Sequence, residues 1–261
     1  MRQCWSNREN LINCTTRSGV EYIFCKAESM GLEVLLNILA IIPAYNEEEC
    51  LADTVSELTS ICPGIDYLVV NDGSSDRTPY ICDELHLNHI DMPVNCGLTS
   101  GVKAGMKYAY RHGYDAAVQF DADGQHRPEF ISKMAEAMHL KNADIVIASR
   151  NLAGGGAAGA RGTGAKLITA LIKRTTKQVI TDPTSGMRMY NRHMIEVFAR
   201  DFDISPEPDT ISLLIRKGAK VIEIPAEMRD RQGGTSYLRY FSAVSYMART
   251  CLSLLLFQWF R

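Results

Sequence analysis

Residues 38–76 have the sequence ILAIIPAYNEEECLADTVSELTSICPGIDYLVVNDGSSD, and the fold class can be predicted from this stretch. Ile38–Pro43 and Asp66–Val70 are short apolar runs rich in β-branched residues, which predicts two buried strands. We expect a helix between them, at about Glu48–Leu58. A strand, a helix and a second strand in this order predict a βαβ unit with parallel strands.

The same alternation continues toward the C-terminus. Two further strands are predicted at Ala116–Phe120 and Ile145–Ala148. The expected helices around them lie at about Thr78–Leu85, Leu98–His112 and Pro128–Leu140. We therefore expect an α/β fold with a mostly parallel sheet that is flanked by helices on both faces.

A glycine-rich segment, Gly154–Lys166 (GGGAAGARGTGAK), follows this core, and its high backbone entropy predicts a mobile loop. It lacks the Gly-Lys-Ser/Thr ending of a nucleotide P-loop. The elements expected beyond it are helices at about Leu167–Gln178, Asp209–Lys217 and Tyr237–Phe260, and strands at Gly186–Tyr190 and Val221–Pro225.

The expected domain organisation has three parts. Residues 1–36 show no sustained apolar period, so we expect an N-terminal extension outside the core. Residues 37–236 form the main domain, and residues 237–261 form a C-terminal amphipathic helix. Its last apolar run, Cys251–Phe260, is shorter than the roughly 18 to 20 residues of a membrane span. A helix of this kind suits a membrane interface or a docking surface.

The composition indicates a folded protein of balanced charge. Of 261 residues, 46% are hydrophobic. The chain has 28 Lys and Arg residues and 30 Asp and Glu residues, which gives a net charge of −2. This balance argues against a nucleic-acid partner bound by bulk electrostatics. The eight cysteines form no CxxC pair and the N-terminus lacks a signal-peptide pattern, so we expect a cytoplasmic protein with reduced thiols.

Three acidic loops each follow a predicted strand, in the segments Ile41–Glu49 (IIPAYNEEE), Val69–Asp76 (VVNDGSSD) and Gln119–His126 (QFDADGQH). One such loop alone is more simply explained as a solvated turn. In an open parallel sheet, however, ligands bind beyond the carboxyl ends of the strands, where these loops would converge. Together they predict a binding site at that edge of the sheet.

The residue types in these loops suit a cation and a nucleoside. Asp121 and Asp123 are two residues apart and can hold one divalent cation, Mg²⁺ or Mn²⁺, to which Gln125 can add a neutral oxygen ligand. Asp72 is placed to accept hydrogen bonds from a base or ribose. The stiff turn that can pack beside the base consists of Pro43, Ala44 and Tyr45.

Four motifs in this order resemble the inverting glycosyltransferases of family 2, which have the GT-A fold: PAYNEE, VVNDGSSDRT, NCGLTSGVKAG and FDADGQH. The resemblance extends from about Asn37 to Tyr237. Within that family, Asp182–Tyr190 (DPTSGMRMY) and Arg229–Ser236 (RDRQGGTS) are similar to segments of dolichyl- and polyprenyl-phosphate sugar synthases. The resemblance implies a Rossmann-like nucleotide-binding half and an acceptor half.

The resemblance also implies an activity and a set of residues. The activity is inverting transfer of a sugar from a nucleotide-diphosphate sugar to a polyprenyl phosphate, dolichyl or undecaprenyl. The donor would contact Glu47, Asp72, Asp121 and Ala122, and the metal would be bound by Asp121, Asp123 and Gln125. The residues expected to bind phosphate or acceptor are Arg150, Ser185, Arg188 and Arg231. Arginine suits this role because it offers a fixed fork of donors to phosphate oxygens. Arg188 has the alternative interpretation of a surface strand residue.

A hydroxyl acceptor would require a general base, whereas a lipid phosphate is already anionic. The candidate bases are Asp182, Glu207 and Asp209. The last two have the alternative interpretation of helix capping before Thr210.

Other functions stay open. Transfer to a sugar hydroxyl, in cell-surface polysaccharide or glycolipid synthesis, is one alternative. The chain lacks the Gln-x-x-Arg-Trp motif of processive synthases, and Tyr237 follows Ser236 where the lipid-phosphate synthases often have Lys. A sugar-nucleotide-binding subunit that depends on a membrane-protein partner is a second alternative. A sugar-nucleotide pyrophosphorylase fits less well because its glycine-rich loop with Arg and Lys is missing at Ile41–Glu49.

The C-terminal region predicts association with the cytoplasmic face of a membrane. Between Arg229 and Arg261 there are five arginines and one aspartate, a net charge of +4, and the stretch ends in leucine and aromatic residues. Basic and aromatic residues on one amphipathic helix favour an anionic lipid surface. The alternative is a helix packed against the protein's own core.

Overall fold

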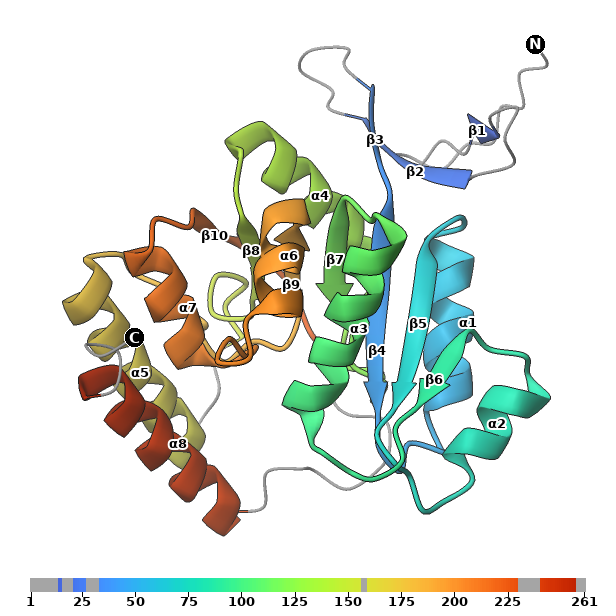
Figure 1. Cartoon of the computed structure of the whole chain (residues 1–261). Helices are drawn as coiled ribbons and strands as arrows, with labels where there is room; N and C mark the ends of the chain where they lie inside the picture. Colours follow the sequence, from blue (N-terminus) through green and yellow to red (C-terminus); the bar gives the residue numbers. More distant parts are fainter. Residues whose placement is uncertain (1–13, 16–20, 27–32, 156–158, 230–239, 257–261) are drawn as a thin grey trace.

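Figure 1 shows the computed structural model of the chain, which describes residues 14–15, 21–26, 33–155, 159–229 and 240–256. Its centre is a seven-stranded sheet with the order β10-β8-β9-β7-β4-β5-β6. The strands are β4 (Ile38–Ala44), β5 (Asp66–Asn71), β6 (His89–Asp91), β7 (Ala116–Gln119), β8 (Ile145–Ser149), β9 (Arg188–Asn191) and β10 (Val221–Pro225). All neighbours are parallel except β9, which runs antiparallel between β7 and β8. The expected mostly parallel sheet is confirmed.

Eight helices accompany the sheet in the described residues. They are α1 (Leu51–Ile61), α2 (Thr78–Glu84), α3 (Leu98–His112), α4 (Glu129–Lys141), α5 (Gly159–Thr176), α6 (Arg192–Arg200), α7 (Pro208–Arg216) and α8 (Tyr240–Leu255). The helices predicted over 78–85, 98–112, 128–140 and 209–217 match α2, α3, α4 and α7 to within a residue at each end. The first predicted helix begins three residues later, as α1.

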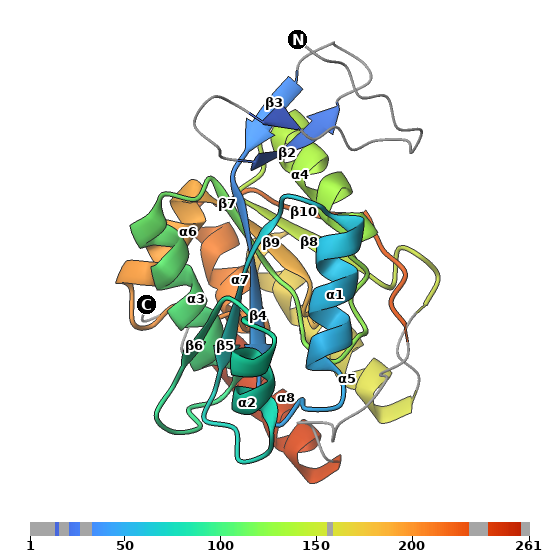
Figure 2. The ribbon, with the colours of Figure 1, turned by 90° about the vertical axis from the view of Figure 1, so that its right-hand side faces the viewer.

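The sheet separates two apolar cores, because successive strand residues point to opposite faces. On one face, Ile38, Ala40 and Ile42 of β4 pack with residues of α1 and α4. On the other face, Leu39 and Ile41 pack with residues of α3, α5, α6, α7 and α8. Figure 2 shows α1 and α3 on opposite sides of the sheet. Every residue of β4 is buried, as expected for a strand covered on both faces.

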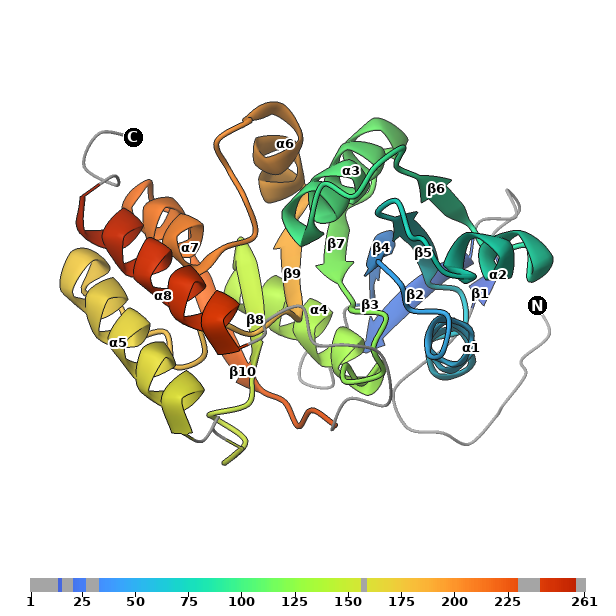
Figure 3. The same ribbon diagram turned by 90° about the horizontal axis from the view of Figure 1, so that it is seen from below.

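The expectation of a mobile glycine-rich loop over 154–166 is wrong for residues 159–166, which form the first turns of α5. The physical reason is close helix packing. A Cβ built at Gly164 would lie 1.6 Å from the Sδ atom of Met247 on α8. Glycine at this position allows α5 and α8 to pack closely, and the two helices lie side by side in Figure 3.

Helix α6 was not predicted, although it has a recognisable N-terminus. Asn191 accepts a hydrogen bond from the backbone N–H of Met194 and so caps the helix. Met194, Ile195 and Phe198 bury its apolar face at helical spacing. The preceding strand was expected at 186–190 and begins at Arg188, so strand and helix follow each other without a loop.

Before the main sheet, β1 (Cys14–Thr15), β2 (Glu21–Lys26) and β3 (Glu33–Leu36) form a separate antiparallel sheet. These strands were not predicted, because residues 1–36 show no sustained apolar period. Strand β3 leads into β4, and β2 contacts α4. Figure 1 shows the small sheet at the amino end of β4, opposite the edge where the acidic loops lie. A division into domains at residue 36 stays a prediction.

The predicted C-terminal helix is present as α8 over 240–255, and the ends of the predicted range lie outside the described residues. It packs against α5 and α7, with Leu254 and Thr250 buried. Leu252, Leu255 and Leu256 stay about half exposed. Packing on the protein's own core therefore accounts for one face of the helix. In the described parts of the chain, no helix combines the length and the apolarity needed to cross a membrane.

Candidate active site

The loops that follow β4 and β5 are joined by hydrogen bonds at the carboxyl edge of the sheet. The backbone N–H groups of Asn46 and Glu48 donate to side chains of the second loop, and that of Glu47 donates to the hydroxyl of Thr78 at the start of α2. In return, Ser75 donates its N–H to the side chain of Asn46. The third acidic loop follows β7, which is the neighbour of β4 on its other side. The three loops thus follow adjacent parallel strands at the same edge of the sheet. Their convergence on one crevice stays a prediction.

Asp72 is buried and holds the start of α3. Its two carboxylate oxygens accept the backbone N–H groups of Cys96 at 2.8 Å and Gly97 at 2.7 Å. A carboxylate at a helix N-terminus is favoured by the unpaired N–H groups and the helix dipole there. Gly73 has a φ of +65°, and a Cβ at this position would lie 2.5 Å from the carbonyl carbon of Val94. The expected contact of Asp72 with a nucleoside stays a prediction.

Asp121 is held by its neighbours on β7 and by His126. Its Oδ1 accepts a hydrogen bond from Gln119 at 2.9 Å, and its backbone N–H donates to Nδ1 of His126. The hydrogen of the neutral His126 ring is therefore on Nε2, which lies 3.7 Å from Oδ2 of Asp121. A Cβ built at Gly186 would lie 2.7 Å from the same Oδ2 atom. The Thr184-Ser185-Gly186 turn thus packs directly behind the Asp121 carboxylate.

Asp123 and Gln125 lie side by side in the same loop. Asp123 accepts the backbone N–H of Gln125 at 3.1 Å and its side-chain N–H at 3.0 Å. The hydroxyl of Thr54 on α1 donates to the carbonyl oxygen of Ala122, which holds the loop against that helix.

The donor set of this loop fits a hard divalent cation. Two carboxylates and one amide supply oxygen atoms, which Mg²⁺ and Mn²⁺ prefer, and further positions would be left for water and phosphate oxygens. No cluster of three or more His, Cys, Asp or Glu side chains suited to a metal occurs among the described residues. Asp121, Asp123 and Gln125 are the residues that would hold the cation in this loop.

Arg150 follows β8 and is paired with Asp182. Its Nε donates to Oδ2 of Asp182 at 2.7 Å and its Nη2 donates to Oδ1 at 2.9 Å. Burial acts to raise the pKa of Asp182, but the hydrogen bonds and charge of Arg150 outweigh it and lower that pKa. A carboxylate whose pKa is lowered and whose two oxygens are occupied is a weak general base.

Ser185 and Arg188 are buried, and their donors contact backbone carbonyl groups. The hydroxyl of Ser185 donates to the carbonyl oxygen of Ala148 at 2.6 Å. The guanidinium of Arg188 donates to the carbonyl oxygens of Pro183 and Pro206. The alternative of a surface strand residue is wrong for Arg188, because it is only 3% exposed. Its observed contacts join β9 to the segment before α7.

Glu207 and Asp209 lie at the N-terminus of α7. Glu207 occupies the N-cap position, and its Oε1 accepts a hydrogen bond from Thr99 at 3.3 Å. Asp209 is in the first turn and accepts a hydrogen bond from Ser253 of α8 at 2.5 Å. Acidic residues are stabilising at this end of a helix. Glu207 makes no side-chain hydrogen bond to the helix N-terminus, so the capping interpretation rests on the charge of the two residues alone.

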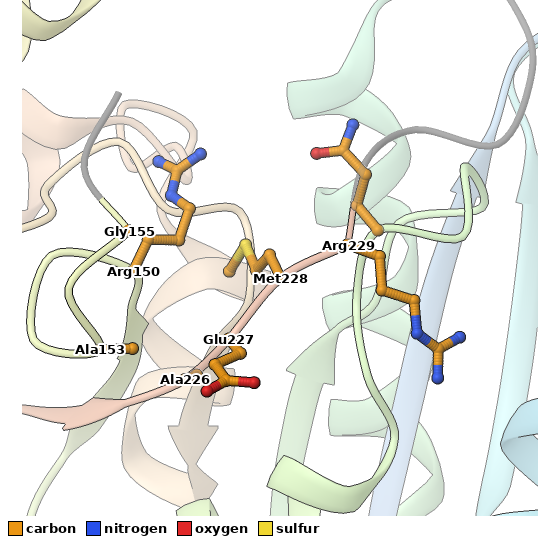
Figure 4. Close-up of a pocket in the computed structure, with 8 residues that line it drawn as sticks. Arg150, Ala153, Gly155, Ala226, Glu227, Met228 and Arg229 are labelled. Atoms are coloured by element: carbon orange, nitrogen blue, oxygen red, sulfur yellow. The ribbon is translucent and has the colours of Figure 1, made fainter. Parts of the chain in front are cut away.

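A pocket of about 290 Å³ connects the Asp-x-Asp loop to Arg150. Its lining residues are Gln125, Arg150, Ala153, Gly155, Ala226, Glu227, Met228 and Arg229. In Figure 4 the guanidinium of Arg150 and that of Arg229 point in different directions. Arg229 forms an ion pair with Glu57 on α1, and its backbone N–H donates to the carbonyl oxygen of Gln125. Arg231, another predicted phosphate ligand, lies outside the described residues.

Three residues of this arrangement were not predicted: His126, Gly186 and Glu223. Glu223 on β10 accepts hydrogen bonds from Thr181 and Asp182, and so supports the turn that holds Arg150. A charged residue inside an apolar strand, VIEIP, is a signal that could have identified it. No local pattern marks Gly186, because its role depends on Asp121, which is distant in the sequence.

The fold and the acidic loops at its carboxyl edge are those of the GT-A class of glycosyltransferases. The chain belongs to the glycosyl transferase family 2, whose family model matches residues 39–198.

Two curated relatives match most of the chain. Polyprenol monophosphomannose synthase of Mycolicibacterium smegmatis is 32% identical over 217 residues, which cover 76% of this chain and 79% of that protein. Undecaprenyl-phosphate mannosyltransferase of Micrococcus luteus is 32% identical over 216 residues, which cover 77% of this chain and 87% of that protein.

Among solved structures, glucosyl-3-phosphoglycerate synthase from Mycobacterium tuberculosis has a similar fold. Its complex with Mn²⁺, uridine diphosphate and glucosyl-3-phosphoglycerate matches with a TM-score of 0.64 at 16% identity. The match covers 85% of this chain and 80% of the other.

Proposed function

We propose that this protein transfers a sugar from a nucleotide-diphosphate donor to a polyprenyl phosphate, with inversion and with a divalent cation. Two relatives at 32% identity carry names that specify a polyprenol or undecaprenyl phosphate and mannose. Mannose is therefore the first sugar to test. The structural neighbour crystallised with Mn²⁺ and uridine diphosphate supports the nucleotide and the cation.

The observation that carries the proposal is the position of Arg150. Its guanidinium is oriented by Asp182 and lines the same pocket as Gln125 of the Asp-x-Asp loop. An oriented arginine beside a cation-binding loop suits an anionic acceptor that must meet the donor at the reacting carbon. A sugar hydroxyl would have no need of this charge.

The three candidate bases support the same acceptor. Asp182 is committed to Arg150, while Glu207 and Asp209 accept hydrogen bonds at the start of α7. None of these settings is that of a carboxylate prepared to take a proton from a substrate hydroxyl. An acceptor that is already ionised removes the need for such a group.

In this mechanism the chain binds and orients two anions. When bound, the cation would neutralise negative charge on the departing nucleoside diphosphate. Asp121, Asp123 and Gln125 would hold it, and Arg150 would hold the acceptor phosphate opposite the leaving group. The loops after β4 and β5 would bind the nucleoside, with Glu47 and Asp72 among their residues. The protein would work as a peripheral protein on the cytoplasmic face of a membrane, where its lipid acceptor is embedded.

A donor panel tests the proposal. Purified protein is supplied with GDP-mannose, UDP-glucose or other sugar nucleotides and Mg²⁺ or Mn²⁺, with and without polyprenyl phosphate. We expect a glycosylated lipid phosphate of inverted configuration only when both substrates and the cation are present. Glu207→Gln and Asp209→Asn should keep most of the activity. Transfer to a sugar hydroxyl instead, with either carboxylate variant inactive, would contradict the proposal.

A further inference from the structure

The carboxylate of Glu223 is bound to two consecutive residues of the segment that precedes β9. Its Oε2 accepts the backbone N–H of Thr181 at 2.7 Å, and its Oε1 accepts the N–H of Asp182 at 2.8 Å. Oε1 also accepts the hydroxyl of Thr181 at 3.0 Å. One side chain on β10 thus receives three hydrogen bonds from residues more than 40 positions earlier in the chain.

The segment that carries Asp182 has no helix or strand of its own, since α5 ends at Thr176 and β9 begins at Arg188. Its position therefore depends on contacts with neighbouring elements. The hydroxyl groups of Thr181 and Ser149 form one such contact at 2.8 Å, and the side chain of Asn151 donates to the carbonyl oxygen of Thr181. The bonds to Glu223 act at the same residue. A carboxylate that accepts backbone N–H groups fixes both the place and the direction of the segment.

Asp182 in turn fixes the position of Arg150 through hydrogen bonds. Besides its two side-chain bonds, the Asp182 carboxylate accepts the backbone N–H of Arg150 at 3.1 Å and the hydroxyl of Thr184 at 3.2 Å. With four contacts and 2% exposure, its orientation is fully determined. The guanidinium uses Nε and Nη2 for these bonds within the described residues, which leaves Nη1 for a ligand in the pocket.

We propose that Glu223 is a positioning residue, which acts through Asp182 to hold Arg150 in the orientation that binds an anionic substrate. This inference rests on the proposed function, in which that substrate is the acceptor phosphate. A glutamine at this position would replace one acceptor oxygen by an NH₂ group that faces a backbone N–H donor. The segment would then have to shift, and Asp182 and Arg150 would shift with it.

A double-mutant cycle tests the proposal with the full chain. The four proteins are wild type, Glu223→Gln, Arg150→Ala and the double variant, and Glu196→Gln on the exposed face of α6 is the matched control. The measurements are the Kd for geranyl phosphate and the Kd for GDP or UDP, whichever the wild type binds. Thermal unfolding checks that each variant is folded.

We expect Glu223→Gln to weaken geranyl phosphate binding about tenfold, as for the loss of one charge-assisted contact. Nucleotide binding should stay unchanged, as should both Kd values of the Glu196→Gln control. In the Arg150→Ala background, Glu223→Gln should have no further effect, because its target is already absent. If Glu223→Gln does not fold, Thr181→Val takes its place in the same cycle. We expect it to weaken geranyl phosphate binding by a smaller factor, and to have no effect in the Arg150→Ala background.

Two results would overturn the inference in distinguishable ways. Normal geranyl phosphate binding by Arg150→Ala would reject the proposed role of Arg150, and the inference with it. A second result would reject the positioning role of Glu223 alone. In it, Arg150→Ala weakens geranyl phosphate binding, while Glu223→Gln binds geranyl phosphate normally or weakens it by the same factor with and without Arg150. The positioning role would also be overturned if Glu223→Gln changed only the Kd for the nucleotide.

Discussion

Asp121 and Asp123 are two residues apart, yet their carboxylates are held in different ways. Asp121 contacts Gln119 and His126 and lies against Gly186, so its position depends on strand β7, on its own loop and on a segment distant in the sequence. Asp123 is bound by Gln125 within the same loop. Part of the position of Asp121 therefore depends on a segment that is distant in the sequence.

We expect Asp123→Asn to lower turnover by roughly 100-fold, because a neutral amide binds a divalent cation more weakly without a change in size. The measurement is sugar transfer at several Mg²⁺ and Mn²⁺ concentrations, with Asp203→Asn on an exposed loop as the control. Full turnover of Asp123→Asn in the presence of a chelator would remove the cation from the mechanism.

Gly186→Ala tests whether the turn behind Asp121 sets the position of that carboxylate. Since the new Cβ would lie 2.7 Å from Oδ2, the carboxylate must move, and we expect about a tenfold loss of activity in a folded protein. Gly101→Ala on α3 is the matched control, because its Cβ would meet Pro43 at an ordinary 3.5 Å. Equal activity of the two variants would show that the Asp121 position tolerates displacement.

Among the elements, α8 has two faces with different surroundings. Leu254 is fully buried against α5 and α7, whereas Leu252, Leu255 and Leu256 are 49%, 48% and 53% exposed. Positions 252, 255 and 256 have the i, i+3, i+4 spacing of one helix face. The exposed Arg249 adds a positive charge one turn earlier. Such a face is suited to an anionic lipid surface.

We expect the protein to float with anionic vesicles in a density gradient, and less so at high salt because the Arg249 contribution is screened. The double variant Leu252→Ser, Leu255→Ser should lose most of this binding. The matched control is Leu85→Ser, Leu140→Ser, which changes leucines of similar exposure directly after α2 and on α4. Flotation of the α8 variant at the wild-type level would contradict a role for this face.

For the whole molecule, the Arg150–Asp182 pair links stability to pH. The folded-state pKa of Asp182 is lowered, so its contribution to stability is complete above the unfolded pKa of 3.8 and is lost as the pH falls through the folded value. We expect Asp182→Asn to cost about 2 kcal/mol at neutral pH, less than a fully buried pair because Arg150 is 31% exposed.

Urea unfolding between neutral pH and about pH 3 measures this linkage. The stability difference between wild type and Asp182→Asn should narrow as the pH falls below 3.8. A difference that stays constant over the whole range would mean that the pair does not hold the Asp182 carboxylate in its charged form.

Much of the fold was predictable because its signals are local. The apolar runs of β4, β5, β7 and β8 lie where they were predicted, since a strand covered on both faces must be apolar throughout. The acidic loops follow directly from those strands, so their common position at one edge of the sheet required only the rule for parallel sheets. Segments such as residues 159–166 were mispredicted because glycine allows both a loop and a close helix contact.

The sequence alone was sufficient to predict the βαβ core, the family and the Asp-x-Asp loop, because the signal for each lies in continuous segments of the chain. The partners of the site residues emerged only in three dimensions. Arg150 pairs with Asp182 and Asp121 lies against Gly186, through segments that are distant in sequence. The buried Arg188 donates to the carbonyl oxygen of Pro206, 18 residues later in the chain. Contacts of this kind depend on how the strands are ordered in the sheet, and the antiparallel insertion of β9 between β7 and β8 brings those segments together.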